Sequence, residues 1–444
     1  MKIVVVLVAL AGVLPLSLLL RSSRRIAEWA WIAIGFLPFL LPAVQQVDIA
    51  LISGEGWIGY VHGAEMTVID FLVIALLIAL PRTRKVLSFH VPLALYMFAL
   101  VLSLTQAAEP VAAFFNVVQF ARIYLLAVVV ARGCAEEGVP LLLMKGLALG
   151  LALQLIVVAY QLASGAYVQP PGTFAHQNTL GMVIHFIALP HFAMFLAGAR
   201  GLQFVVVPPM SLLIAALTAS RATIVLCLAG LGLTYFLSLF RGVSKRKITT
   251  GALGFLVVLL VVPIALSSFE RRIAATPLSE NAYDERAAFN RAAAMIVDGN
   301  PWGVGANHYV YVAKNFGYSI KAGVIDVDGN LNNIVHNAYL LAAVETGYLG
   351  LFAFVVLLFY PLVTAFRYSL SAPTLVAGDL LMGIAAALTI VSLHSSYEYI
   401  LFGQDVQYVF AITFGIVAGV ASRVAMRKPA TVGPQPLLRD GAVI

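Results

Sequence analysis

The chain has 444 residues, of which 61% are hydrophobic and only 11% are charged, and its mean hydropathy is +0.97. Soluble globular proteins are far less apolar, so the composition excludes that class and predicts a polytopic membrane protein. The formal net charge of +7 comes from basic residues scattered in short clusters between apolar stretches, which indicates membrane orientation and argues against a nucleic-acid surface.

Apolar stretches long enough to cross a bilayer, about 17–25 residues each, recur along the whole sequence. Pro15 interrupts the first of them, and Pro208 and Pro209 leave the division of 203–240 open, so the sequence predicts twelve or thirteen membrane-spanning helices in an all-α fold. The first stretch has no small-residue cleavage site, which favours a retained span over a removed signal peptide. The thirteen candidates lie near residues 2–20, 26–44, 66–80, 91–107, 110–131, 141–163, 179–198, 203–218, 221–240, 249–268, 336–366, 374–396 and 403–422.

Lysine and arginine are distributed unevenly between the connections of these spans. Connections after odd-numbered candidates hold basic residues, for example Arg82, Arg84 and Lys85. Because basic connections tend to stay in the cytoplasm, we expect the even-numbered connections outside and the C-terminal tail, 423–444, inside. Four even-numbered connections hold no basic residue: 45–65, 107–109, 164–178 and 397–402.

One connection is far longer than the others. Residues 269–335 lie on the predicted external side and carry both acidic and basic residues. We therefore expect a folded external subdomain between an N-terminal bundle, 1–268, and C-terminal helices, 336–422. Its stretch SENAYDERAAFNRAAAMIVDGNP predicts a helix that begins near Ser279 or Asn281 and ends at residues 298–301.

Two arginines fall at or within apolar spans, where a charge is costly and is therefore a functional candidate. Arg221, in LTASRATIVLCL, opens a span on the external side. It either snorkels to the interface or binds a phosphate, whose oxygens a guanidinium can contact in pairs. Arg122, in NVVQFARIYLL, lies near the middle of a span and either pairs with a carboxylate such as Asp70 or Glu109 or binds a ligand.

The predicted external helix carries Arg286 and Arg291. They lie roughly 140° apart around a helix, so they share a broad side but not one stripe. Asp284 and Glu285 are near enough in sequence to neutralise Arg286, which leaves a solvated charge and an anion-binding role equally open. For Arg291 a structural role is favoured over substrate binding.

The motif IVHNAYLLAAVETGYLG, residues 334–350, places His336 and Asn337 where the external segment meets an apolar span. The histidine is either a helix cap or a general base, because imidazole can take a proton from a hydroxyl group near neutral pH. Asn337 is a candidate for orienting substrate. Glu345 lies about 13–14 Å further along the helix, too far to touch His336, and we expect it to cap a helix or pair with an arginine inside the bundle.

Three other external stretches hold polar residues. In QPPGTFAHQNTLG, His176 and Asn178 either cap the following helix or line an entrance for a ligand. HSSYEYILFGQDVQY, residues 394–408, belongs either to a sugar pocket or to an interfacial aromatic belt. In NPWGVGANHY, Gly303 and Gly305 favour a tight connection over phosphate binding.

The sequence supports no catalytic metal site. Cys134 and Cys227 fall in or beside apolar stretches, where we expect them to pack, so neither a cysteine metal site nor a disulfide framework is indicated. Asp326 and Asp328 form the closest acidic pair, which would suit calcium but not catalytic zinc. We expect a metal-independent mechanism without a cofactor.

The order of these motifs resembles the O-antigen ligase and polymerase superfamily of bacterial envelope polysaccharide enzymes. The resemblance rests on PGTFAHQN before one span, SRA at the start of another, an external segment with ER and NPWGVG, and HNAYLLAAVETGYLG. It covers most of the chain, its motifs lie within 170–350, and it does not separate ligases from polymerases. It implies a GT-C-like glycosyltransferase with twelve spans, so the first of the thirteen candidates is expected to be a short hairpin or an interfacial piece.

The resemblance also implies an activity. Ligases of this kind transfer a glycan from undecaprenyl diphosphate to a lipid A core sugar, with inversion, at the periplasmic face of the bacterial inner membrane. By correspondence of motifs, Arg221 and Arg286 would hold the diphosphate, and His336 would be the base or would position the acceptor. A ligase is favoured, and a polymerase that extends a lipid-linked glycan or, from another class, a transporter or flippase are the alternatives. The further candidates for substrate binding are Arg122, Arg291, Asn337, His176 and Asn178.

Overall fold

The computed structural model describes residues 2–44, 49–54, 56–81, 89–256, 284–372 and 375–426. The predicted spans coincide with helices throughout these ranges, because backbone groups in lipid must find their hydrogen bonds within the segment. A helical stretch at 245–256 begins the tenth candidate, whose remainder lies outside the described residues. The other spans are α1 (Lys2–Ser22), α2 (Arg24–Leu40), α3 (Val68–Ala79), α4 (His90–Ser103), α5 (Pro110–Gly133), α6 (Val139–Ala163), α7 (Gln177–Leu196), α8 (Leu202–Leu217), α9 (Arg221–Leu239), α15 (Ala338–Ser371), α16 (Leu375–His394) and α17 (Gln404–Met426).

Eight of the described helices are long and apolar enough to cross a membrane, namely α2, α5, α6, α7, α9, α15, α16 and α17. The described parts of α1, α3, α4 and α8 are apolar but shorter. Large apolar side chains face outward, for example Leu14 and Tyr160, which are 62% and 73% exposed. Such faces suit contact with lipid and not with water. The chain is therefore a multi-pass membrane protein, while the count of twelve or thirteen spans stays a prediction.

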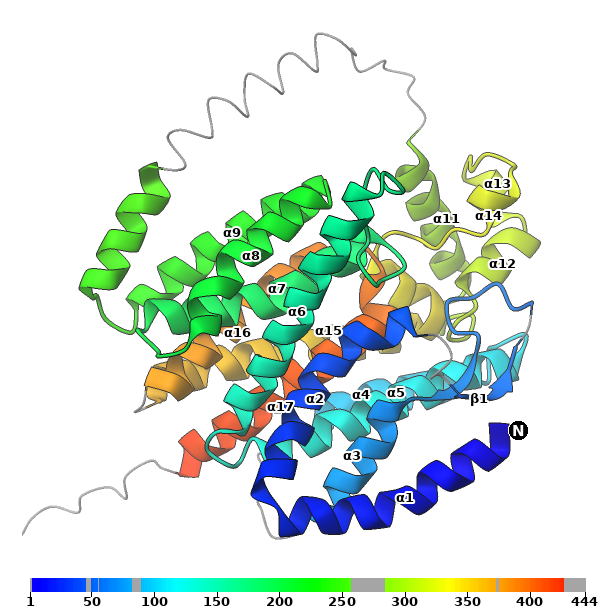
Figure 1. Ribbon diagram of the computed structural model, residues 1–444. Helices are drawn as coiled ribbons and strands as arrows, with labels where there is room; N and C mark the ends of the chain where they lie inside the picture. Colours follow the sequence, from blue (N-terminus) through cyan, green and yellow to red (C-terminus); the bar gives the residue numbers. More distant parts are fainter. Residues whose placement is uncertain are drawn as a thin grey trace, which may run out of the picture.

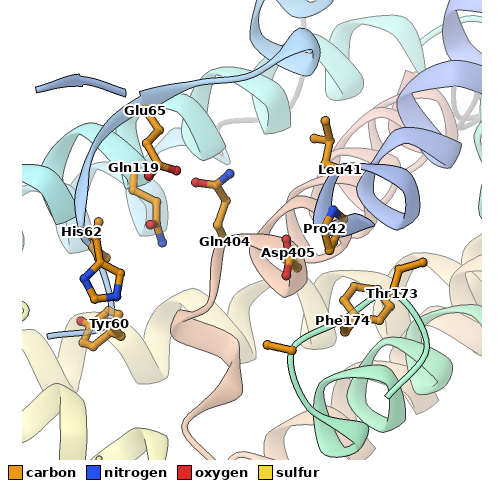
Figure 2. A pocket seen from close by; sticks show the side chains of 12 residues that line it. Leu41, Pro42, Tyr60, His62, Glu65, Gln119, Thr173, Phe174, Gln404 and Asp405 are labelled. Carbon is orange, nitrogen blue, oxygen red and sulfur yellow. The ribbon is translucent and has the colours of Figure 1, made fainter. Parts of the chain in front are cut away.

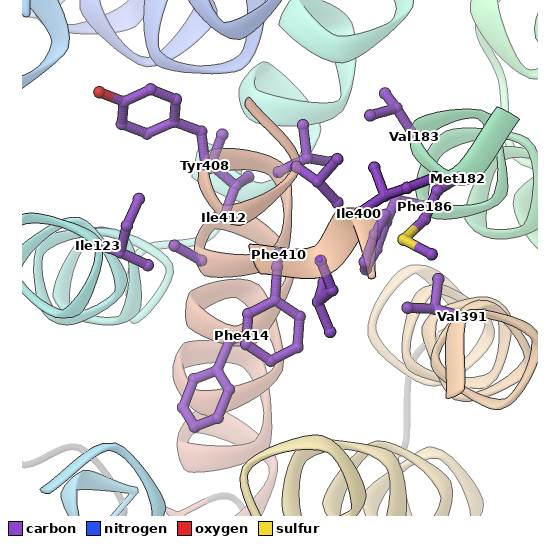
Figure 3. Close-up of a cluster of buried hydrophobic side chains, with 14 of the residues drawn as sticks. Ile123, Met182, Val183, Phe186, Val391, Ile400, Tyr408, Phe410, Ile412 and Phe414 are labelled. Carbon is purple, nitrogen blue, oxygen red and sulfur yellow. The ribbon is translucent and has the colours of Figure 1, made fainter. Parts of the chain in front are cut away.

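Helix α17 lies at the centre of the bundle, where it packs against α5 and α15. Figure 3 shows Phe410 and Phe414 of α17 among side chains from α5, α7 and α16, including Ile123, Phe186 and Val391. All five of these side chains are buried. The packing fixes the start of α17, and with it the segment that connects α16 to α17.

The pairs α2 with α6 and α7 with α16 pack along much of their lengths. A short antiparallel hairpin, β1 (Ile49–Ser53) with β2 (Gly63–Met66), is the exception to the all-α prediction among the described residues. The external segment contributes α11 (Glu285–Gly299), α12 (Tyr309–Asn315), α13 (Tyr318–Lys321) and α14 (Asp328–Leu331), which lie together at one end of the bundle (Figure 1). Short 3-10 turns are η1 (Leu41–Ala43) and η3 (Ile400–Phe402).

The helix predicted in the external segment is present as α11, but its described start differs from the prediction. Asp284 is the N-cap, and its carboxylate accepts a hydrogen bond from the backbone N–H of Ala287 at 3.1 Å. An aspartate cap followed by Glu285 in the first turn suits the positive end of the helix dipole. The prediction of a start near Ser279 or Asn281 was wrong for α11, and those two residues lie outside the described ranges. The predicted end, at residues 298–301, is confirmed by the C-cap at Asn300.

Residues 300–309 dock against α15 at a break in its helix. Gly347 has a φ of 66°, in the left-handed region that favours glycine. A Cβ atom on Gly347 would overlap the backbone of Pro301 and Trp302, and one on Gly303 would overlap Gly347 itself. The Gly-x-Gly stretch is thus a tight connection, as predicted. Three backbone bonds hold it: Val304 N to Val344 O (2.9 Å), Gly305 N to Glu345 O (3.0 Å) and Tyr348 N to Pro301 O (3.0 Å).

Candidate active site

The carboxylate of Glu398 joins side chains from three other parts of the fold. Its Oε1 atom accepts hydrogen bonds from Nη2 of Arg286 at 2.9 Å and from Nδ2 of Asn178 at 2.7 Å. Its Oε2 atom lies 3.0 Å from Nδ1 of His336. Glu398 itself is only 4% exposed. Residues from α11, α7, the start of α15 and the α16–α17 connection therefore meet at one buried carboxylate.

The network continues from Asn178 to the start of α9. Ser220 donates a hydrogen bond to Oδ1 of Asn178 at 2.9 Å, and Thr223 donates to Ser220 at 2.9 Å. Ser220 is the N-cap residue of α9, and Arg221 is its first residue. The SRA motif therefore lies one hydrogen-bonded side chain away from the Glu398 carboxylate.

The two arginines assigned to a diphosphate differ in their surroundings. Arg286 is 51% exposed although it is paired with Glu398, so part of its guanidinium remains open to solvent. Arg221 is exposed and forms no ion pair within the described ranges. Both arginines are thus accessible to an anion. The acidic partner of Arg286 is Glu398, and not Asp284 or Glu285 as one prediction held.

Opposing effects set the charge of the cluster. Burial alone would raise the pKa of Glu398, but the hydrogen bond and charge of His336, the charge of Arg286 and that of His394 lower it below its ordinary value. Burial lowers the pKa of His176, and the charges of His336 and Arg286 lower it further against the opposing effect of Glu398. Glu398 is therefore ionised and His176 neutral at pH 7.

His336 has an aromatic surrounding on two sides. Its ring lies edge-on to Tyr399, with ring centroids 5.8 Å apart, and 6.3 Å from the ring of Phe289. Its side chain is 27% exposed, so it is fixed in place but still open to a ligand. Since an ionised carboxylate can only accept, Nδ1–H of His336 donates the hydrogen bond to Glu398, and the lone pair of Nε2 is left to take up a proton.

Two predicted candidates beside this cluster serve as helix caps. His176 is the N-cap of α7, and its Nδ1 atom accepts a hydrogen bond from the N–H of Asn178 at 3.1 Å. Asn337 is the N-cap of α15, with Oδ1 accepting from the N–H groups of Tyr339 and Leu340 at 3.0 and 3.1 Å. These caps orient the two helices whose ends carry Asn178 and His336.

The remaining two candidates lie in other networks. Arg122 forms an ion pair with Asp70 at 2.7 Å, and the two side chains are 10% and 7% exposed. This is the pairing with a carboxylate that one of the two predictions for Arg122 held. Its guanidinium also donates to the hydroxyl of Tyr408 at 2.6 Å. Arg291 donates twice to the carbonyl of Ala322, at 3.1 and 2.9 Å, which ties α11 to the end of α13. Both arginines thus have protein partners, and their part in substrate binding stays a prediction.

Glu345 has a different partner from the one expected. Its carboxylate accepts from the hydroxyl of Tyr60 at 2.6 Å and from the backbone N–H groups of Asn307 and Tyr309 at 2.8 and 3.1 Å. It thus caps the start of α12, as one alternative held, but the expected pairing with an arginine was wrong. The reason is that the 300–309 connection, and not a charged side chain, fills the space beside this part of α15.

A cavity of about 380 Å³ lies next to the cluster, between the hairpin, the 173–175 turn and the start of α17. Figure 2 shows Glu65, Gln119 and Gln404 on one side of it and Thr173 and Phe174 on the other. The described residues contain no group of three or more His, Cys, Asp or Glu side chains arranged to hold a metal ion. The metal-independent mechanism stays a prediction.

The sequence offered Glu398 only as part of a stretch that belongs either to a sugar pocket or to an aromatic belt, and did not place it with His336, Arg286 or Asn178. Its stretch, HSSYEY, reads equally well as an aromatic belt, and the signal available was one carboxylate between two tyrosines on the external side. No curated protein matches the chain. Residues 209–355, which include Arg221, Arg286 and His336, match a family described as O-antigen ligase. This match supports the resemblance to the O-antigen ligase and polymerase superfamily that the sequence motifs carry.

Proposed function

We propose that the protein is an O-antigen ligase of the bacterial inner membrane, with its active site on the periplasmic face. It transfers a glycan from undecaprenyl diphosphate to a lipid A core sugar in lipopolysaccharide biosynthesis. The observation that carries the proposal is the hydrogen-bonded network in which Glu398 joins Arg286, His336 and Asn178. It gathers motifs from distant parts of the chain around one partly exposed histidine and two accessible arginines.

The arginines would serve the leaving group. When the bond between the anomeric carbon and the phosphate oxygen breaks, the diphosphate takes the electron pair and gains negative charge. Arg221, without an acidic partner in the described ranges, and the exposed part of Arg286 can stabilise that charge more strongly in the transition state than in the bound donor.

His336 would serve the acceptor. The acceptor hydroxyl oxygen forms the new bond to the anomeric carbon, and its proton passes to Nε2 of His336. Glu398 fixes the imidazole through Nδ1 and balances the positive charge that develops on the ring. Attack from the side opposite the diphosphate inverts the anomeric configuration without a nucleotide sugar, a metal ion or a cofactor taking part.

A polymerase that extends a lipid-linked glycan is the nearest alternative, because the transfer chemistry is shared and only the acceptor differs. A transporter or flippase is the alternative from another class. The test supplies purified protein with an undecaprenyl-diphosphate-linked glycan and either lipid A core or a second lipid-linked unit. We expect product on lipid A core, and loss of it in His336→Ala and Arg221→Ala proteins that elute and melt like the wild type.

Each other outcome of this assay overturns a stated part of the proposal. Product formed only on the second lipid-linked unit would replace the ligase by a polymerase. Full activity of both variants would remove His336 and Arg221 from the site. No transfer to either acceptor, together with movement of the lipid-linked glycan across liposomes, would replace the enzyme by a transporter. Arg24→Ala is a suitable control because that arginine is 94% exposed and paired only within its own helix.

A further inference from the structure

The cavity beside the Glu398 network has polar walls without a lysine or arginine side chain. The residues that line it include the carboxylates Glu65 and Asp405 and the amides Gln119 and Gln404, but neither lysine nor arginine. Its volume of about 380 Å³ is within the range of roughly 300–1,000 Å³ typical of small-molecule sites. A diphosphate would be repelled here, so the occupant must be a ligand without negative charge.

The nearest arginine does not change that conclusion. Arg122 donates to Oε1 of Gln404 at 3.2 Å, and its charge is already balanced by Asp70. The bond also fixes the Gln404 amide so that its Nε2 atom remains a donor. Glu65 makes no side-chain hydrogen bond to any residue that the structure describes. Gln119 donates from Nε2 to Phe402 O and to Gln407 Oε1, so its Oε1 atom is the part left for a ligand. One wall therefore offers the Gln404 amide as a donor and the oxygens of Gln119 and Glu65 as acceptors.

Apart from Thr173, the opposite wall is apolar. Phe174, Leu41 and Pro42 line it, and Phe174 packs edge-on against Phe39 with ring centroids 6.0 Å apart. Hydroxyl groups both donate and accept hydrogen bonds, while the C–H faces of a sugar ring are apolar. A wall of carboxylates and amides facing a wall of aromatic and aliphatic carbon suits such a two-sided ligand.

The cavity shares two segments with the proposed active site. Ala175 lines it directly before His176 and Asn178. Gln404 lines it at the end of the segment that begins with Glu398 and passes through η3. Gln119 fastens that segment by donating to the carbonyl of Phe402 at 3.1 Å. A sugar in the cavity would therefore contact both of the segments that place Asn178 and Glu398.

We propose that this cavity is a carbohydrate subsite, in which Glu65, Gln119 and Gln404 bind hydroxyl groups of a neutral sugar next to the Glu398 network. The inference rests on the proposed function and deepens it, since it separates a site for sugar from the arginines that would hold the diphosphate. The sugar belongs either to the glycan of the donor or to the core of the acceptor, and the two are separated by experiment.

The test places one reactive thiol in the cavity. Ala175 is exposed, and the two native cysteines, Cys134 and Cys227, are both fully buried, so Ala175→Cys provides a selective site for a maleimide. The labelling rate of the purified full chain is measured with three probes. These are core oligosaccharide freed of lipid A, glycan released from the donor lipid, and inorganic pyrophosphate. His62→Cys, also exposed and lining the cavity, is the second reporter.

We expect one of the two saccharides to slow labelling at both reporters and pyrophosphate to leave it unchanged. The saccharide that protects identifies the source of the sugar. In the Glu65→Gln background, half-protection should need about tenfold more saccharide, the effect of losing one hydrogen bond to a charged group. Asp298→Asn, the same change of charge on the exposed face of α11, should leave the protection unchanged.

The outcomes separate this proposal from the proposed function, because protection does not require transfer. Normal glycan transfer with no protection by either saccharide at either reporter would overturn the subsite. Equal protection by pyrophosphate would overturn it as well. Protection by a saccharide in a protein that transfers no glycan to any acceptor would uphold the subsite and overturn the ligase.

Discussion

Nδ1 of His336 lies 3.0 Å from Oε2 of Glu398, in a cluster where the carboxylate is buried and the histidine remains partly open. A buried acceptor on one nitrogen selects the tautomer with the lone pair on the other. The same carboxylate also receives Arg286, so a single residue positions a proposed base and a proposed anion-binding group.

Replacement of Glu398 by glutamine should therefore reduce kcat of glycan transfer without a matching change in KM. The amide keeps the size of the side chain but removes the charge that balances a protonated His336, and we expect a loss of about 10²-fold, at the lower end for general-base catalysis. Initial rates at varied donor and acceptor concentration measure kcat and KM separately. Glu398→Asp should recover part of the rate, and a parallel rise in KM with unchanged kcat would contradict the positioning role.

The two arginines should respond differently to replacement by lysine. Arg221 forms no ion pair in the described parts of the chain, so Arg221→Ala should lower kcat by about 10²–10³-fold, the effect of removing one group that stabilises transition-state charge. Arg221→Lys should restore only part of the lost kcat, because an ammonium cannot contact two phosphate oxygens side by side. Arg286→Lys should also loosen Glu398. Equal activity of the lysine and alanine variants at position 221 would exclude a role for its charge.

The sequence was sufficient for much of the fold because lipid leaves few choices for the backbone. Each long apolar stretch had to become a helix, and the described helices follow the predicted boundaries closely. Breaks inside helices were harder to see. Gly347 lies in the middle of one apolar run, and only its contact with the 300–309 connection explains why the helix breaks there.

The sequence predicted the motifs that meet at the candidate site, but it did not predict that Glu398 joins them. His336, Arg286 and Asn178 were selected because each lies on the external side in a polar motif. Glu398 is separated from them by 62, 112 and 220 positions. Pairing over such distances depends on how α7, α11, α15 and α16 pack, which local patterns do not contain. The same limit applies to Glu345, whose partners come from a connection and not from an arginine.

The buried pair of Arg122 and Asp70 should matter for stability and not for substrate binding. Arg122→Ala leaves the Asp70 charge buried without its partner, a change that costs about 3–5 kcal/mol in buried pairs. The melting temperature of the purified Arg122→Ala protein should fall strongly. In the double variant Arg122→Ala with Asp70→Asn it should fall less. The KM of the protein that remains folded should be unchanged. A raised KM at normal stability would show that Arg122 takes part in substrate binding.

Acid should weaken the fold through Glu398. Its pKa is below the ordinary value of 4.5 in the folded protein, so the unfolded chain binds the proton more readily. The stabilisation is therefore complete above about pH 4.5 and is lost as the pH falls through the lower pKa of the folded state. Melting midpoints of the wild type and Glu398→Gln should differ at pH 7 and converge on acidification. A difference that stays constant with pH would contradict the charged network.

The break at Gly347 should tolerate no side chain. Alanine there would have to adopt a left-handed φ, which costs about 1–2 kcal/mol, and its Cβ would also overlap Pro301 and Trp302. We expect Gly347→Ala to lower the melting temperature and to reduce transfer, since the displaced connection holds the half of α15 that follows His336. Gly232→Ala is the matched control, because a Cβ there meets nothing within 4 Å and alanine favours the helix. Its melting temperature should be unchanged or raised, and an equal loss in both variants would show that the effect does not come from the break.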